Sequence, residues 1–196
     1  MQRLMQMNQR IQVAGARRSR LSRPQLRFGA VLALGLAAFL IGWLIFGARN
    51  DDSAAANGAS AKSESELRDF AASSSTPVYW AGPRDGQTYE VTRTSDDRVY
   101  IRYLPEGVEP GDPRPQFLTV GTYPRPGAWA ELRRAAREPG AVSRDLPNDG
   151  LMVYSRSRPT SVYIGYAGGR YQVEVYAPSA GSARDLVLAG QVVPVR

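Results

Sequence analysis

An uncharged run of 21 residues, 28–48, limits what this chain can fold into more than any other feature of the sequence. As a helix, the run is about 31 Å long, which matches the roughly 30 Å hydrocarbon core of a bilayer. It is apolar on all sides and contains four glycines, so it lacks the polar stripe of a helix that lies on a soluble domain. The sequence therefore predicts a transmembrane helix over 28–48.

The charges on either side of this run predict its orientation. Residues 1–27 carry seven arginines and no acidic residue, whereas residues 28–196 carry 18 basic and 18 acidic side chains. The whole net charge of +7 therefore precedes the run, and the positive-inside rule places the N-terminus in the cytoplasm and the C-terminal domain outside the cell membrane. The arginines nearest the run, which we expect to set this topology, are Arg17, Arg18, Arg20, Arg23 and Arg27.

Other interpretations of the N-terminal region are open. A soluble core helix would need a larger protein around it than this chain provides, and a cleaved secretory signal would be cut near the small residues 53–60. Because the apolar part of such a signal spans only roughly 7–15 residues, we expect a retained single-pass signal anchor instead. The basic tail 1–27 is expected to do no more than set topology. The alternative is a helix lying along the inner membrane surface.

Composition divides the rest of the chain into a spacer and a domain. Residues 49–76 are rich in serine, alanine and acidic side chains, which predicts a flexible spacer. Within it, Ser63 and Glu66 have the spacing of a capping box, which indicates one or two helical turns. Residues 77–196 contain short apolar and aromatic runs separated by glycine and proline, as expected of an extracytoplasmic α+β domain.

Alternating hydrophobicity predicts the elements of this domain. Val99, Ile101 and Tyr103, for example, line one face of a strand. The predicted strands are 77–82, 87–94, 98–104, 116–123, 150–156, 161–166 and 170–176, and the predicted helices are 126–138 and 178–191.

Two parts of the domain resemble each other. At an offset of 63 residues, Arg93, Val99, Tyr100, Ile101 and Tyr103 match Arg156, Val162, Tyr163, Ile164 and Tyr166. Each block is followed by another strand, a proline and a helix, which suggests two β-β-β-α units related by a pseudo-two-fold axis; chance similarity of two tyrosine-rich strands is the alternative. We expect the helices to pack on one face of an antiparallel sheet, leaving the other face exposed for binding.

Residue types exclude several kinds of chemistry. The chain has no cysteine and no histidine, so it has no disulfide, no thiol nucleophile and no serine–histidine–aspartate triad. It contains no phosphate-binding glycine motif, and no metal site or cofactor is expected. Since residues 28–196 carry no net charge, we also expect no nucleic-acid partner.

Aromatic residues are the remaining candidates for a site. Aromatic side chains on an exposed sheet face stack on sugars or bind peptides at little cost in entropy, although core packing explains most of them equally well. If the strands form as predicted, one face opposite the valine and isoleucine side chains would carry the candidate partner-binding residues Tyr100, Arg102, Tyr163 and Tyr176.

We therefore expect a non-catalytic, single-pass envelope protein whose exported domain binds or senses an envelope component or serves as an accessory subunit. Its expected partners are membrane lipid and another envelope or membrane protein. One alternative is a hydrolase of cell-wall or extracellular polymer that uses paired carboxylates. The carboxylates available to it are Glu90, Asp96, Asp97, Asp149 and Glu174. A further alternative is a transmembrane regulator that docks a cytoplasmic partner through residues 1–27.

Overall fold

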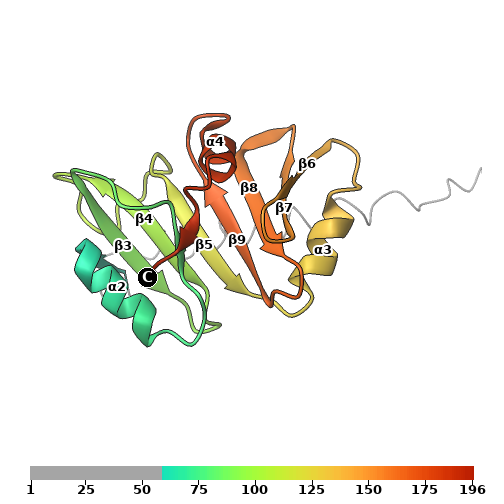
Figure 1. Ribbon diagram of the computed structural model, residues 1–196. Helices are drawn as coiled ribbons and strands as arrows, with labels where there is room; N and C mark the ends of the chain where they lie inside the picture. Colours follow the sequence, from blue (N-terminus) through green and yellow to red (C-terminus); the bar gives the residue numbers. More distant parts are fainter. Residues whose placement is uncertain (1–58) are drawn as a thin grey trace, which may run out of the picture.

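An antiparallel sheet of eight strands runs through residues 59–196, the part of the chain that the computed structural model describes (Figure 1). The strand order is β1-β3-β4-β5-β9-β8-β7-β6. The strands are β1 (Ser60–Lys62), β3 (Gln87–Arg93), β4 (Val99–Pro105), β5 (Thr119–Pro124), β6 (Ala141–Leu146), β7 (Gly150–Ser155), β8 (Arg158–Tyr166) and β9 (Tyr171–Tyr176). A small second sheet pairs β2 (Tyr79–Trp80) with β10 (Val193–Pro194), and the helices are α2 (Glu64–Ser73), α3 (Ala128–Ala135) and α4 (Ser182–Leu188). The described residues thus form an α+β fold.

The tail 1–27, the predicted span 28–48 and the first part of the predicted spacer lie outside the described residues. Between residues 59 and 196, no helix is long and apolar enough to cross a bilayer.

The order of the strands gives the sheet an approximate internal symmetry. The series β3-β4-β5 and β7-β8-β9 lie side by side and meet where β5 pairs with β9. In the middle of this pairing, Val120 lies opposite Val175 and Thr122 lies opposite Val173. A rotation of 180° about an axis perpendicular to the sheet places the first of these pairs on the second. This axis passes through the intervening pair, Gly121 and Glu174, so Glu174 lies at the centre of the pseudo-symmetric sheet.

The two faces of the sheet differ in chemistry and in what covers them. We call them the valine face and the Glu174 face. The valine face carries Val91, Ile101, Val120, Val162 and Val175 and packs against α2, α4 and the β2–β10 pair. The Glu174 face carries the alternate residues of the same strands, and α3 packs against it over β7, β8 and β9. Figure 1 shows α2 and α3 at opposite ends of the sheet.

The prediction that both helices lie on one face is therefore wrong for α3. This helix buries Leu132 and Ala135 against Leu151, Val153 and Tyr163, which belong to the Glu174 face. The helix comes close to β8 at a glycine, because a Cβ at Gly165 would lie 3.2 Å from a methyl carbon of Leu132. The strand order is mirrored on the two sides of the β5–β9 pair, whereas α3 and α4 lie on opposite faces of the sheet.

The prediction of a flexible spacer is wrong for residues 60–73. β1 pairs with β3, and α2 buries Leu67 completely in the main core. The capping box is confirmed, since the backbone N–H of Glu66 donates to Ser63 Oγ and that of Ser63 donates to the Glu66 carboxylate. The segment looked like a spacer because a three-residue strand and a helix with one fully buried residue carry little apolar signal.

Candidate functional site

The structure places all four predicted binding residues on the Glu174 face. Arg102 and Tyr176 belong to one row across the strands, in which Glu90, Arg102, Thr119, Tyr176 and Ser161 are successive neighbours. Tyr100 and Tyr163 belong to the next row on the same face, together with Gly121 and Glu174. The alternation read from the sequence was therefore sufficient to bring together residues from β4, β8 and β9.

This face is not open, contrary to expectation. Helix α3 covers Tyr163, whose exposed fraction is 3%. At the other end of the sheet, the proline-rich connection 106–118 between β4 and β5 folds back over Arg102, which is 8% exposed. Two of the four predicted residues are therefore enclosed, and Tyr100 and Tyr176 are half-buried.

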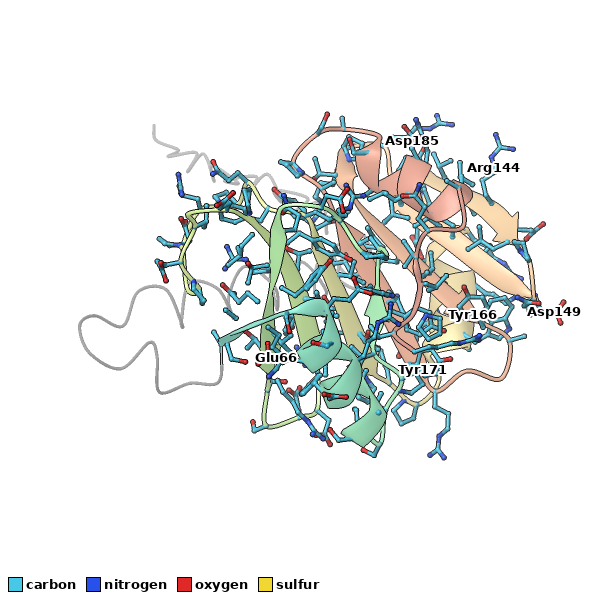
Figure 2. The ribbon with its side chains drawn as sticks, turned by 60° about the vertical axis from the view of Figure 1, so that its left-hand side comes forward. Glu66, Arg144, Asp149, Tyr166, Tyr171 and Asp185 are labelled. Atoms are coloured by element: carbon cyan, nitrogen blue, oxygen red, sulfur yellow. The ribbon has the colours of Figure 1, made fainter. Side chains whose placement is uncertain are left out.

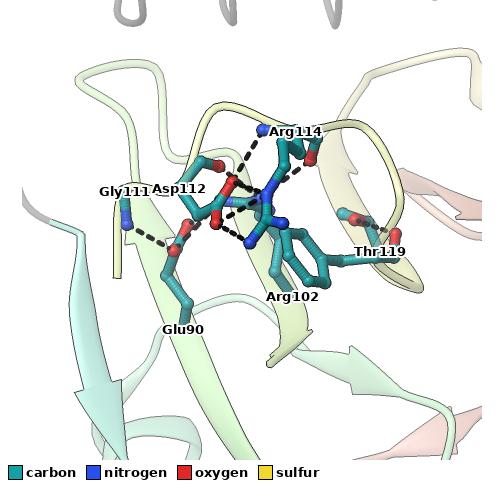
Figure 3. Close-up of polar contacts among 7 residues, drawn as sticks. Glu90, Arg102, Gly111, Asp112, Arg114 and Thr119 are labelled. Carbon is teal, nitrogen blue, oxygen red and sulfur yellow. Dashed lines mark hydrogen bonds and ion pairs between the residues drawn. The ribbon is translucent and has the colours of Figure 1, made fainter. Parts of the chain in front are cut away.

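Arg102 forms the centre of a buried ion pair (Figure 3). Its Nη1 atom donates to both carboxylate oxygens of Glu90, at 2.8 and 3.0 Å, and the exposed fraction of Glu90 is 3%. The 106–118 connection completes the arrangement, because Gly111 N–H donates to Glu90 at 2.7 Å and Arg102 Nη2 donates to the carbonyl of Asp112 at 2.7 Å. These contacts assign Arg102 the role of holding the connection against the sheet.

Aromatic and ionic contacts fix the rest of this connection. The ring of Phe117 contacts two guanidinium groups, whose central carbons are 5.0 Å (Arg102) and 5.8 Å (Arg114) from its centroid. Hydrogen bonds from Arg114 lower the pKa of Asp112 to about 2. The hydroxyl of Tyr176 donates to the carbonyl of Pro115 at 2.7 Å. The predicted binding residue Tyr176 thus also contacts the chain itself.

Glu174 is held at the middle of the face by two tyrosines. It is 2% exposed and accepts hydrogen bonds from Tyr123 Oη at 2.6 Å and from Tyr163 Oη at 3.1 Å. Burial is the main cause that raises the pKa of this carboxyl group above its ordinary value, and the tyrosine hydrogen bonds partly oppose it. Burial and the nearby carboxylate in turn raise the pKa of both tyrosines, so they remain donors.

Tyr123 is the site residue that sequence analysis missed. Its ring folds over Gly121, where a Cβ would lie 2.6 Å from the Tyr123 hydroxyl, and it meets the ring of Tyr100 edge-on at 5.6 Å. The sequence pattern that could have revealed it is the alternation of Thr119, Gly121 and Tyr123 on one face of a strand. The missing side chain at Gly121 leaves room for the ring of Tyr123.

The raised pKa of Glu174 predicts a pH dependence of stability. At pH values between the pKa of Glu174 in the unfolded chain and its higher pKa in the folded chain, the folded chain binds more protons than the unfolded chain. The free energy of unfolding therefore falls as pH rises through the folded pKa, by at most about 1.4 kcal/mol per pH unit. Guanidinium unfolding at several pH values, followed by tryptophan fluorescence, measures this slope. In Glu174→Gln the same region of the profile should be flat. Equal slopes in the two proteins would show that another group is responsible.

The carboxylates proposed for a hydrolase do not converge in this structure. Asp96 and Asp97 lie in the exposed β3–β4 turn and form ion pairs with Arg98 at 2.7 Å and Arg93 at 2.6 Å. The buried pair of candidates, Glu90 and Glu174, belong to β3 and β9, three strand spacings or about 14 Å apart. Glycosidase carboxyl groups are about 5–9.5 Å apart.

Asp149 lies apart from these groups, in the exposed turn between β6 and β7, where its φ of 53° marks a left-handed turn residue. The described part of the chain contains no group of three acidic side chains placed to hold a metal ion.

An open pocket of about 410 Å³ lies beside the 106–118 connection, within the usual size range of ligand sites. Its wall includes the aromatic rings of Tyr103 and Phe117 and the side-chain amides of Gln87 and Gln116. The guanidinium of Arg84 stacks on the Tyr103 ring, 5.7 Å from its centroid, and forms no ion pair with any residue of 59–196. Asp85 also lines the pocket, and this carboxylate together with the amides, the guanidinium and the aromatic rings suits the binding of a polar ligand.

Comparison of the chain with protein-family models, with curated proteins and with solved structures found no match.

Proposed function

We propose that this chain is a single-pass membrane protein with its N-terminus in the cytoplasm and a non-catalytic binding domain outside. The observation that carries the proposal is the uncharged run 28–48, preceded by the seven arginines that account for the entire net charge. In this proposal, the exported domain begins at residue 59 or shortly before it, since β1 pairs with β3 and α2 packs into the core.

The arrangement of charged side chains supports binding over catalysis. Glu90 is neutralised by Arg102, and Glu174 is enclosed by tyrosines, so neither buried carboxylate faces a cleft with a second acid. The pocket beside Arg84 is the better candidate site, and we propose that it takes a polar segment of an envelope polymer or of another membrane protein. A duplicated β-β-β-α unit would account for the symmetry of the strands.

A binding experiment tests this proposal. The full chain, solubilised in detergent and immobilised, is incubated with envelope extract alongside the pocket variant Arg84→Ala/Gln116→Ala. We expect an envelope component to be retained by the unaltered chain and reduced at least tenfold on the pocket variant. The control Ser95→Ala, in the exposed β3–β4 turn, should retain the component fully. Equal retention by the pocket variant would contradict the assigned site, and no retention above background would contradict the binding function.

A further inference from the structure

The outward side of α3 is formed by arginines. Arg133 and Arg134 on α3, and Arg137 two residues beyond its end, are exposed. At helical spacing they span an arc of about 100°, opposite the side that buries Leu132 and Ala135. None of the three forms an ion pair with a residue of 59–196. Like charges this close repel one another. The nearby carboxylates do not offset them, since Glu131 pairs with Arg125 and Glu138 forms no ion pair with the three arginines, so the arrangement favours an anionic partner.

Unpaired arginines continue beyond the helix at the same end of the sheet. The turn between β7 and β8 lies beside the end of α3, because Arg156 N–H donates to the carbonyl of Gly140 at 2.9 Å, and this turn and the start of β8 carry the exposed side chains of Arg156 and Arg158. Neither forms an ion pair within the described chain. We call these five residues, Arg133, Arg134, Arg137, Arg156 and Arg158, the basic end.

The charge of the domain is segregated along the sheet. Residues 125–170, which include α3, β6, β7 and β8, contain eight arginines and four acidic residues, a net charge of +4. Residues 59–124 contain seven basic and ten acidic residues, a net charge of −3. Strand order places these two parts at opposite ends, and Figure 2 shows Arg144 and Asp149 of the β6–β7 hairpin far from Glu66 on α2. The net charge of the domain is close to zero, but the two ends of the sheet carry opposite charges and form a strong dipole.

The surroundings of the arginines favour lipid over protein as the anionic partner. A stable protein interface has an apolar core, often with exposed aromatic anchors. Among residues 59–196, the exposed large hydrophobic side chains are Leu188 on α4 and Val193 on β10. Both elements pack on the valine face, away from the arginines. The basic end therefore offers charge with only the half-buried Trp129 as a large apolar side chain on α3, as in polybasic segments that bind anionic headgroups.

The length of the chain before β1 makes such a contact geometrically possible. This step rests on the proposed membrane anchor. Residues 49–59 can reach at most about 40 Å from the end of the span, and the sheet is about 34 Å wide from β1 to β6. The domain therefore stays within reach of its own bilayer, and the end farthest from the tether can touch it while the acidic end is repelled.

We propose that the basic end docks the exported domain onto anionic headgroups of the membrane in which the chain is anchored. Docking fixes the orientation of the domain, with α3 facing lipid and the acidic strands β1, β3 and β4 facing away. The contact is electrostatic, so it weakens as the Debye length falls from about 10 Å at 0.1 M salt to about 4 Å at 0.5 M.

A fluorescence experiment on the full chain tests the proposal. The chain contains no cysteine, so Ala130→Cys, exposed among the α3 arginines, and Thr88→Cys, exposed at the acidic end of the same face, each accept one fluorophore. Both proteins are incorporated into nanodiscs whose lipids carry a headgroup quencher, with either 30% phosphatidylglycerol or phosphatidylcholine alone. We expect at least threefold stronger quenching at position 130 than at position 88 in the anionic discs, and equal quenching in the neutral ones.

The controls separate docking from anchoring. Raising salt to 0.5 M, or introducing Arg133→Gln/Arg134→Gln/Arg137→Gln, should abolish the difference between the two probes. Equal quenching at both positions in anionic discs at low salt would overturn docking, as would a difference that persists in neutral lipid. Co-elution of the chain with neutral discs in size-exclusion chromatography measures membrane anchoring independently of docking. A chain that does not co-elute is tested by sedimentation with anionic vesicles, where binding lost at 0.5 M salt supports docking and absent binding overturns it.

Discussion

Arg102→Met is expected to lower the free energy of unfolding by about 3–5 kcal/mol, because it leaves the carboxylate of Glu90 buried without its counter-charge. The same substitution removes the donor that holds the carbonyl of Asp112 and the cation stacked on Phe117. The 106–118 connection should therefore detach from the sheet before the rest of the domain unfolds. Guanidinium unfolding and limited proteolysis within 106–118 measure the two effects.

Two comparison variants isolate the buried charge as the cause. In Glu90→Gln/Arg102→Met, the side chain at position 90 keeps an acceptor for Gly111 N–H but carries no charge, so most of the lost stability should return. Arg93→Ala breaks an exposed ion pair of 2.6 Å and should cost less than about 1 kcal/mol. If the double variant were as unstable as Arg102→Met alone, packing of the Arg102 side chain would be the dominant contribution.

Leu67→Ala is expected to cost about 2–5 kcal/mol, the usual range for emptying a fully buried leucine site. The side chain belongs to α2, which packs against the valine face beside Trp80, and the guanidinium of Arg68 lies over the same indole ring. Guanidinium unfolding followed by tryptophan fluorescence measures the loss. The result separates a structured start of the domain from a spacer, because a leucine in a flexible segment would contribute nothing.

The matched control for this substitution lies on the same helix. Asp69→Ala changes an exposed residue two positions further and should alter the free energy of unfolding by no more than about 0.5 kcal/mol. A small effect of Leu67→Ala, equal to that of the control, would mean that the domain begins near residue 77 after all.

Local pattern was sufficient to predict β3, β4, β5, β7, β8 and β9 and which of their residues share a face, whereas β1, β6 and β10 were not predicted. Strict alternation in 98–104 and 161–166 places Tyr100 and Tyr163 opposite the valine side chains, and strand pairing then brings them to the same row. The side chain of Glu174 lies on the opposite face from Val173 and Val175, as that alternation requires.

Contacts between distant residues could not be predicted in this way. The partner of Arg102 is 12 residues away on another strand, and the carbonyl groups that complete its environment come from a connection whose path no local signal fixes. The face on which α3 packs is set by a cluster that joins Leu132 to Val153 and Tyr163, residues that lie far from the helix in the sequence. The completion of the Glu174 site by Tyr123 likewise depends on the register of β5 against β9.

Topology mapping of the full chain is the most direct test of the central claim, that 28–48 anchors an exported domain. Alkaline phosphatase and green fluorescent protein are fused in turn after Arg196, with a matched pair of fusions that lack residues 28–48. The account predicts an active phosphatase and a dark fluorescent protein in the membrane fraction, and the reverse in the soluble fraction for the deletions. A fluorescent, phosphatase-negative pair from the intact chain, or a domain released from washed membranes, would contradict it.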